Sequence, residues 1–426
     1  MKSDCGQLIY DLIAELYPIC RSITGDGVRR TLRIVGEHIP LDVVEVSSGT
    51  RVFDWTVPKE WNIRDAWIRD ESGKRIVEFK KHNLHVLNYS LPVRRKIGLA
   101  ELREHLFTLP DHPDWIPYRT SYYDEAWGFC MTHRQYAQLE DQTYEVMIDS
   151  TLEPGSLTYG ELLIRGNSDE EILIATHLCH PSLCNDNLSG VALATHLARE
   201  LVSRNSGYSY RFLFVPGTIG SITWLSLNQQ AVGKIRHGLV ISLLGDTGSF
   251  CYKKSRRGNA EIDRIVARVL QDRSCEHRIL DFSPYGYDER QFCSPGFNLP
   301  VGRLTRTPNG EFPEYHTSAD DLNFVSPNSL AGSFELLLAI VDEIETAERY
   351  LNLKPHCEPQ LGTRGLYSST GGEKDLKEFQ LALLWVLNLS DGTHSLKDIE
   401  TISGMPPATL RLAIDALLKT DLLERL

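Results

Sequence analysis

The chain has 426 residues, of which 42% are hydrophobic and 24% charged, and its formal net charge is -12 at pH 7. Such a length exceeds one ordinary hydrophobic core, so we expect two or three domains. The acidic balance disfavours general nucleic-acid binding, which needs clustered Lys and Arg. Residues 1–20 carry acids within their apolar part, which indicates an amphipathic helix rather than a signal peptide. We therefore expect a cytoplasmic protein with no membrane partner.

Nine cysteines are scattered along the chain without a CxxC motif. An odd count at irregular spacing predicts neither a disulfide framework nor a four-cysteine zinc site. We expect most of them to be small buried hydrophobic residues.

The first 150 residues divide into two regions that differ in composition and hydrophobic periodicity. Apolar residues at helical spacing predict a helix near the N-terminus and a second one over residues 27–39. Residues 51–150 are rich in Trp, Tyr and His, and short alternating runs such as 82–93 and 144–151 predict strands of a small β-rich unit. Its aromatic side chains either line a cleft or form a small core, and the core is the simpler interpretation.

From about residue 158 the pattern alternates between strands and helices. Strands are predicted at 170–176, 210–216, 237–245 and 299–307, and helices at 188–204, 217–229, 259–272 and 327–351. This alternation predicts a mostly parallel sheet covered by helices on both faces. Sites in such sheets form beyond the carboxyl ends of the strands.

The C-terminal part follows a Gly-, Pro- and Ser-rich linker at residues 355–375. Short helices around the Gly-Met-Pro turn at 404–406 indicate a helix-turn-helix in a winged-helix setting. The last helical segment has as many acids as bases, so we favour a protein-contacting or intramolecular role over DNA binding. Self-association through this unit or the β-rich unit remains an open alternative.

Histidines and acids follow several of the predicted strands. His177 and His180 come at the end of one strand, and Asp186 precedes the next helix. Asp246 directly follows another strand, and His316 lies in an acid-rich loop. Neutral imidazole and carboxylate are the ligands of hydrolytic zinc sites. Turn formation and helix capping explain each residue taken singly, but together they form a set that can converge on a metal ion.

Asp288 and Glu289 form a further acidic pair in the loop at 285–292. They can orient metal ligands, bind a substrate amine or move protons. The alternative is a solvated loop whose acids pair with Arg290.

Four motifs together resemble the zinc-dependent aminopeptidase superfamily, whose members use a co-catalytic metal pair: THLCHPSLCNDNLSG, GDTGSF, YDERQFCSPGF and EYHTSADDL. The chain is most similar to a bacterial branch with an inserted domain of unknown function, matched here by FDWTVPKEWNI, NLHVLNYS and IPYRTSYYDEAWGFC, and a C-terminal winged helix. The resemblance implies an α/β catalytic domain over residues 1–50 and 150–354. It further implies a β-rich inserted domain over 51–149 and a winged helix over 355–426.

The resemblance also implies a function. The chain would be a zinc-dependent hydrolase of the aminopeptidase type, acting on a peptide or small amide through metal-activated water. His180, with His177 as the alternative, and Asp246 would form the first metal site, Asp186 would be the bridging carboxylate, and His316 would belong to the second site. The cofactor would be zinc, one ion with a second left open. Asp288 would lie beside the substrate, and Asp288 and Glu289 are the candidate catalytic residues.

One departure from the family pattern bears on activity. Members carry Glu-Glu or Glu-Thr after the strand at 210–216, where the first Glu activates water, whereas this chain has Gly217 and Thr218. Glycine cannot accept a proton, so Glu289 or Glu314 would have to replace the base. The alternatives are a specialised biosynthetic enzyme and a non-catalytic metal-binding relative.

Overall fold

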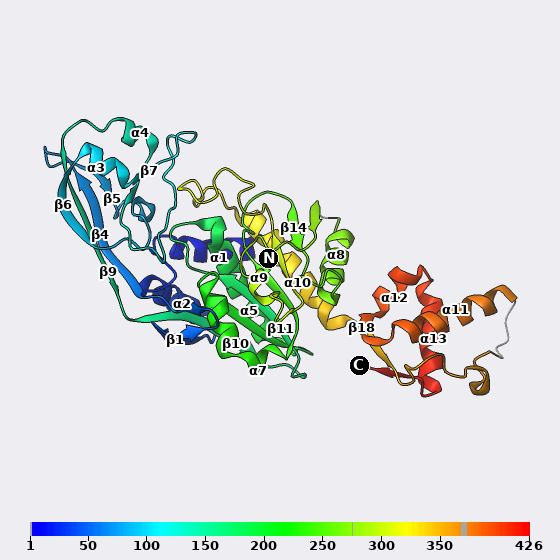
Figure 1. Ribbon diagram of the computed structural model, residues 1–426. Helices are drawn as coiled ribbons and strands as arrows, with labels where there is room; N and C mark the ends of the chain where they lie inside the picture. Colours follow the sequence, from blue (N-terminus) through cyan, green and yellow to red (C-terminus); the bar gives the residue numbers. More distant parts are fainter. Residues whose placement is uncertain (1, 275, 368–372) are drawn as a thin grey trace. The chain divides into compact units, whose positions relative to one another are not determined.

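The computed structural model describes residues 2–274, 276–367 and 373–426. The chain divides into two compact units, the first ending at Ala339 and the second beginning at Ile340 (Figure 1). The predicted boundary of the last domain, residue 355, lies inside the second unit.

A mixed eight-stranded sheet forms the centre of the first unit. In spatial order its strands are β1 (Asp42–Ser47), β10 (Ser156–Ile164), β12 (Ser209–Val215), β11 (Glu171–His177), β13 (Ile235–Ile241), β16 (Val301–Thr305), β14 (Phe250–Lys253) and β15 (His277–Leu280). The four central strands β12, β11, β13 and β16 are parallel. β10 pairs antiparallel with β1 and β12, and β14 pairs antiparallel with β16 but parallel with β15. The predicted α/β class is confirmed.

Helices cover this sheet on both faces. They are α1 (Lys2–Leu16), α2 (Asp26–His38), α5 (Gly190–Val202), α6 (Ile219–Leu227), α7 (Gln229–Val232), α8 (Glu261–Asp272), α9 (Glu289–Phe292) and α10 (Pro327–Thr346). Leu173 and Ala175 of β11 share a hydrophobic cluster with Trp224 of α6. Ile172 and Ile174, which alternate with these residues along the strand, are equally buried. Successive strand side chains point to opposite faces of a sheet. Ile172 and Ile174 therefore face the side where α5 contacts β11 and β12.

The aromatic-rich region contains a four-stranded antiparallel sheet. Its order is β5 (Arg75–Glu78), β4 (Glu60–Arg69), β9 (Thr143–Glu153) and β6 (Val93–Gly98). Smaller elements surround it: β2 (Arg51–Val52), β3 (Trp55–Thr56), η1 (Asn83–His85), α3 (Leu99–Glu104), β7 (Leu106–Phe107), β8 (Phe129–Cys130) and α4 (His133–Ala137).

The strand predicted over residues 82–93 is wrong for most of its length. The His82 side chain accepts a hydrogen bond from the Leu84 amide, 3.1 Å away, and so starts the short turn η1. The Asn88 side chain donates to the Arg21 carbonyl oxygen at 3.0 Å. Local side-chain hydrogen bonds of this kind compete with a strand ladder.

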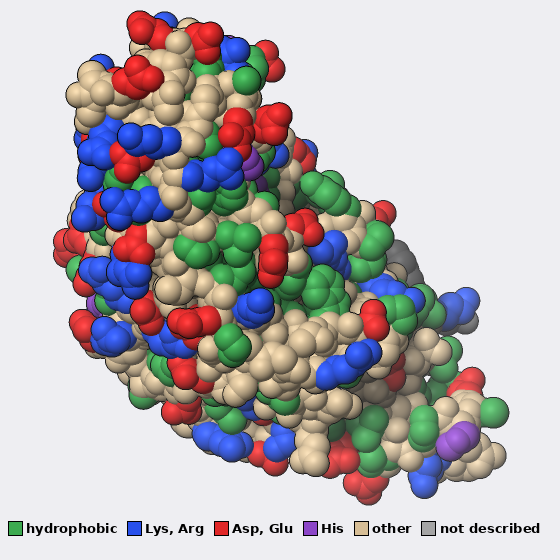
Figure 2. All heavy atoms as spheres, turned by 60° about the vertical axis from the view of Figure 1, so that its left-hand side comes forward, with side chains coloured by type: hydrophobic (Ala, Val, Ile, Leu, Met, Phe, Trp, Pro, Cys, Tyr) green, Lys and Arg blue, Asp and Glu red, His purple; other side chains and the backbone are tan. Residues whose placement is uncertain are grey.

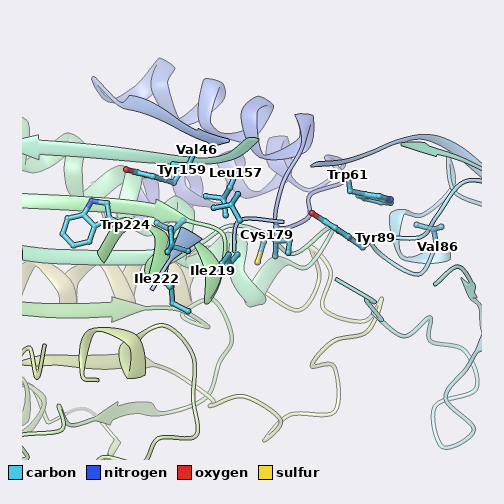
Figure 3. Packing of buried hydrophobic residues seen from close by; sticks show 14 of the residues in the cluster. Val46, Trp61, Val86, Tyr89, Leu157, Tyr159, Cys179, Ile219, Ile222 and Trp224 are labelled. Atoms are coloured by element: carbon cyan, nitrogen blue, oxygen red, sulfur yellow. The ribbon is translucent and has the colours of Figure 1, made fainter. Parts of the chain in front are cut away.

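One continuous hydrophobic cluster joins the two larger sheets of the first unit (Figure 3). Trp61 of β4 stacks on Tyr89 with ring centroids 5.8 Å apart, and its indole N–H donates to the Ser90 carbonyl oxygen. The same cluster includes Tyr159 of β10 and Trp224 of α6. The predicted core interpretation of the buried tryptophans therefore holds for Trp61, while Trp55 is 40% exposed.

The second unit has a three-stranded antiparallel sheet, β18 (Asp391–Ser395), β17 (Arg349–Asn352) and β19 (Leu423–Arg425), with helices η3 (Gly362–Arg364), α11 (Glu373–Leu389), α12 (Leu396–Ser403) and α13 (Pro407–Lys419). The helix predicted over 327–351 ends at Thr346, because the following residues pair with β18 and β19. Gly404, at φ +66°, ends α12 and turns the chain toward α13. The predicted winged helix is confirmed.

The surface mixes charges of both signs. Figure 2 shows a face on which Lys and Arg side chains lie among Asp and Glu side chains. Ion pairs of the chain include Arg64–Asp149 and Arg69–Glu145. No helix in the described part of the chain is long and apolar enough to cross a membrane. The eight described cysteines are free, five of them buried; Cys275 lies outside the described residues.

Candidate metal centre

The carboxyl ends of the central parallel strands converge at one edge of the large sheet. β11 ends at His177, β12 leads into Gly217 and Thr218, β13 leads toward Asp246, and β16 leads into the loop that carries His316. Parallel strands bring their carboxyl ends to the same edge, which is where open α/β sheets bind ligands.

Three histidines surround the carboxylate of Asp186. His177 Nε2 lies 2.9 Å from Asp186 Oδ1, and His316 Nε2 lies 3.0 Å from Asp186 Oδ2. His180 Nδ1 lies 3.3 Å from Oδ2. One ligand atom each from His177, His180 and Asp186 fall within 4.8 Å of one another. The sequence left His177 and His180 as alternatives, and the structure brings both to the same carboxylate.

Burial sets the protonation of this cluster. Burial lowers the pKa of His177 to about 4 and also lowers the pKa of His316, so both imidazoles are neutral at pH 7. Burial alone would raise the pKa of Asp186, but His180 and the hydrogen bonds from His177 and His316 outweigh it and hold that pKa well below its usual range. Neutral imidazoles around an ionised carboxylate are in the protonation states that metal binding requires.

A second layer of contacts fixes the ligands. The Asn187 side chain donates to Thr176 Oγ1 at 2.8 Å and to the His177 carbonyl oxygen at 2.9 Å. Arg21 is fully buried and donates from Nε to the His180 carbonyl oxygen at 2.9 Å. Asp320 accepts from the amides of Asn185 and Asp186, at 2.6 and 2.9 Å. Such partners hold first-layer ligands in position and tune their affinity.

Asp246 lies beside this cluster, where other groups occupy its carboxylate. It accepts from the Asn185 side chain at 2.9 Å, from Thr307 Oγ1 at 2.8 Å and from the Gly248 amide at 2.6 Å. These bonds tie the loops after β13 and β16 to the segment that holds Asp186. In the structure Asp246 therefore braces these loops, and like His316 it lies outside the group of three that His177, His180 and Asp186 form.

Tyr287 fills the space in front of Gly217. A Cβ atom at position 217 would overlap the Tyr287 hydroxyl and ring, far inside van der Waals contact. The Tyr287 ring lies 4.0 Å from the His177 ring between centroids, and its hydroxyl is 3.6 Å from Cys179 Sγ. Burial raises the pKa of Tyr287 well above its usual range, so the phenol keeps its proton. The glycine thus makes room for a hydroxyl next to the cluster.

Asp288 and Glu289 accept hydrogen bonds from the segments that carry Thr218 and Tyr287. Asp288 Oδ1 accepts from the Thr218 amide at 2.7 Å, which holds Thr218 in the left-handed region at φ +62°. Burial raises the pKa of Asp288 to about 7. Glu289 is fully buried, forms an ion pair with Lys253 and accepts from the Tyr287 amide at 3.1 Å. Both acids position Tyr287 and Thr218, and neither lines the pocket in front of the cluster.

That pocket has a volume of about 380 Å³ and opens onto His180 and His316. Its described lining consists of Ile23, Trp55, Tyr118, Arg119, Thr120, Tyr122, Tyr123, His180, Gly217, Thr218, Tyr287 and His316. Tyr118 stands edge-on to His180 and His316, with ring centroids 5.2 and 5.1 Å away. The aromatic-rich region therefore supplies one wall of the pocket, and the sheet edge supplies the floor.

Sequence reasoning missed several residues of this site. Tyr287 is adjacent to the acids that the motif drew attention to, but nothing local marks a tyrosine as facing a glycine 70 positions away. Arg21 is a charged residue in an otherwise apolar and polar-neutral stretch, ICRSIT, which is a usable signal for a buried functional contact. Tyr118 and Arg119 carry no such signal.

The donor set fits a zinc ion. His177, His180 and Asp186 supply two imidazoles and a carboxylate, the ligand types of hydrolytic zinc sites, and their burial favours a bound cation over an exposed acidic cluster. His316 adds a third imidazole, 3.0 Å from Asp186 Oδ2. Where the family pattern has Glu-Glu or Glu-Thr, this chain has Gly217 and Thr218, which offer no carboxylate to a metal ion.

Family models match both parts of the chain. A family model described as a domain of unknown function, DUF4910, matches residues 10–347, which is more than half of the chain. The chain belongs to the DUF4910 family. A winged helix-turn-helix model matches residues 348–425.

A relative from Clostridium acetobutylicum is 54% identical over 423 residues, spanning 99% of this chain and 97% of the relative. Its name assigns it to polysaccharide biosynthesis and gives it an aminopeptidase-like domain. A crystal structure of a protein named as a peptidase from the same organism matches with a TM-score of 0.85 at 52% identity, covering 100% of this chain and 97% of that one.

More distant structures share the fold. A zinc aminopeptidase from Bacillus subtilis matches with a TM-score of 0.58 at 12% identity, covering 80% of this chain and 95% of that one. An M28 peptidase precursor from Shewanella amazonensis SB2B matches with a TM-score of 0.57 at 12% identity, over 81% and 96%. The resemblance to the zinc aminopeptidase fold, drawn from the motifs, is thereby confirmed for this DUF4910 chain.

Proposed function

We propose that this chain is a zinc-dependent hydrolase that cleaves an amide bond. The observation that carries the proposal is the meeting of three imidazoles and Asp186 at the floor of a pocket open to small molecules. The fold shared with zinc aminopeptidases supports it.

His177, His180, Asp186 and His316 would hold one zinc ion. When bound, the ion supplies a Lewis acid that polarises a carbonyl group and lowers the pKa of a water molecule. Asn187, Arg21 and Asp320 keep the ligands aimed at that point through the hydrogen bonds described above.

Tyr287 would donate a hydrogen bond to the carbonyl oxygen as negative charge develops on it. Its phenol is protonated at neutral pH because burial raises its pKa, and it stands against His177 at the pocket wall. A preorganised donor at this position stabilises the transition state more than the ground state. Asp288 and Glu289 hold the loop that aims it.

Metal analysis combined with hydrolysis tests this proposal. We expect the purified protein to bind about one zinc ion per chain, and Asp186→Asn and His177→Asn to reduce zinc affinity by more than about tenfold while keeping the native circular dichroism spectrum. Asp246→Asn is the matched control, because its acceptor oxygen can still brace the loops, and it should retain zinc. Folded protein without zinc affinity, or zinc-loaded protein that cleaves no amide in a broad panel, would refute the proposal.

A second candidate is deacylation of a carbohydrate amide in polysaccharide biosynthesis. The name of the Clostridium acetobutylicum relative supports this setting. The pocket supports it as well, since Trp55, Tyr122 and Tyr123 offer flat apolar faces of the kind that pack against ring substrates. Release of acetate from N-acetylated amino sugars, compared with cleavage of aminoacyl amides, separates the two candidates.

A further inference from the structure

The charge of the pocket is opposite to what a substrate with a free amine requires. Among the described residues, the pocket lining includes Arg119 and contains no Asp or Glu. An exopeptidase that binds a substrate ammonium group needs a carboxylate to face it, because an unpaired charge in a pocket is costly. In this pocket the ammonium group of such a substrate would instead face the cationic Arg119.

Arg119 is held rigidly at this position by backbone contacts. The Asn88 amide donates to the Arg119 carbonyl oxygen at 2.9 Å, and the Tyr118 amide donates to the His316 carbonyl oxygen at 2.8 Å. Isolated bridges join Asn88 to Thr120 and Pro117 to Thr317. The segment bearing Arg119 is therefore fastened directly to the loop bearing His316, so its distance from the metal centre is fixed before any ligand arrives.

The Arg119 side chain is also free to bind. Arg64 and Arg134 of the same region are paired with Asp149 and Asp114. No hydrogen bond or ion pair engages the Arg119 guanidinium among the described residues, whereas its carbonyl oxygen accepts from the Asn88 amide. A guanidinium fork with unused donors matches a carboxylate in bidentate geometry.

We propose that Arg119 selects an amide substrate that carries a carboxylate group and no free α-amine. This inference rests on the proposed amide hydrolysis for the reaction, but the recognition itself needs only the pocket. The body of the substrate would lie along Trp55 and Tyr123, whose rings meet edge to face with centroids 5.6 Å apart, and along Tyr122, which hydrogen-bonds to Tyr118 at 2.7 Å between hydroxyl oxygens.

Calorimetric titration of the zinc-loaded full chain with three anilides tests the selection. The probes are the mono-4-nitroanilide of succinic acid, its methyl ester, and alanine 4-nitroanilide, which present a negative, a neutral and a positive group. We expect the acid to bind about tenfold more tightly than the ester, in line with one charge-assisted hydrogen-bonded pair at an exposed site, and alanine 4-nitroanilide to bind most weakly.

Two variants test whether the preference for the acid over the ester depends on Arg119. Arg119→Gln should remove the preference for the acid over the ester and leave ester binding unchanged. Arg33→Gln, which removes the same charge from the exposed face of α2 outside the pocket, should keep the preference. If the preference survives in Arg119→Gln, the carboxylate binds the zinc ion or another group, and the inference is wrong.

Equal binding of acid and ester, tightest binding of alanine 4-nitroanilide, or no binding of any probe would also overturn the inference. The release of nitroaniline is recorded in the same samples. Arg119-dependent binding without any hydrolysis would leave the recognition standing and refute the hydrolase proposal, so the two failures are distinguishable.

Discussion

Replacing Gly217 with alanine tests whether this glycine is there to seat Tyr287. The added Cβ atom would overlap the Tyr287 hydroxyl and two of its ring carbons. Gly217 does not have a positive φ, so alanine introduces no backbone strain and the effect comes from the contact alone. The Tyr287 ring is already against His177 and cannot move toward it, since their centroids are 4.0 Å apart.

The expected magnitude follows from overpacking. Forcing an extra methyl group into a filled site costs about 1–3 kcal/mol, so we expect Gly217→Ala to lower the free energy of unfolding by about 2 kcal/mol. Displacement of the hydroxyl by about 1 Å should lower kcat/KM by roughly 100-fold. Gly217→Glu restores the residue type of the family pattern, yet it should lower turnover for the same reason.

Urea unfolding followed by tryptophan fluorescence, together with steady-state kinetics, measures both effects. Gly233→Ala is the control, because the nearest atom to its added Cβ is 3.9 Å away, and its stability should change by less than about 0.5 kcal/mol. Truncating the ring in Gly217→Ala/Tyr287→Ala should recover about 1–3 kcal/mol relative to the sum of the single variants. If Gly217→Ala is as stable and as active as Gly233→Ala, Tyr287 does not occupy this space.

Three further predictions concern the residues behind the site. Burial raises the folded-state pKa of Asp288 from 3.8 to about 7, so its contribution to stability is complete below pH 4 and is lost as pH rises toward 7. Across that window the unfolding free energy of wild type should therefore fall by up to about 4 kcal/mol relative to that of Asp288→Asn. A difference between the two that does not change with pH would contradict this prediction. Arg21→Met should weaken zinc binding about tenfold in chelator competition by freeing the His180 backbone, and unchanged affinity would rule out that positioning role. Glu289→Gln should lower the unfolding free energy by about 3–5 kcal/mol, because Lys253 loses the carboxylate that pairs with its charge. Since the glutamine oxygen can still accept from the Tyr287 amide and hold that residue in place, kcat/KM of the folded fraction should stay within about twofold of wild type; lost turnover at native stability would make Glu289 catalytic.

One error of the sequence interpretation has a clear physical origin. The run at 82–93 has the alternation of a strand, but the side chains of His82 and Asn88 bond to nearby and distant backbone groups instead. Asp246 follows a strand as predicted, and Thr307 and Asn185 donate to its carboxylate in the structure; its role as a metal ligand stays a prediction. For the run at 82–93, side-chain hydrogen bonds to backbone groups took the place of a strand ladder.

The sequence by itself determined the alternation of strands and helices, the winged helix and the residue types of the metal centre, because periodicity and strand-end chemistry are properties of neighbouring residues. Only the tertiary structure decided which of these side chains lie next to one another at the candidate metal centre. His316 and Asp186 are 130 residues apart in the chain, and the position of Arg119 over the pocket depends on how a segment of the aromatic-rich region docks on the His316 loop. Such contacts follow from sheet register and packing between distant segments, which no local pattern encodes.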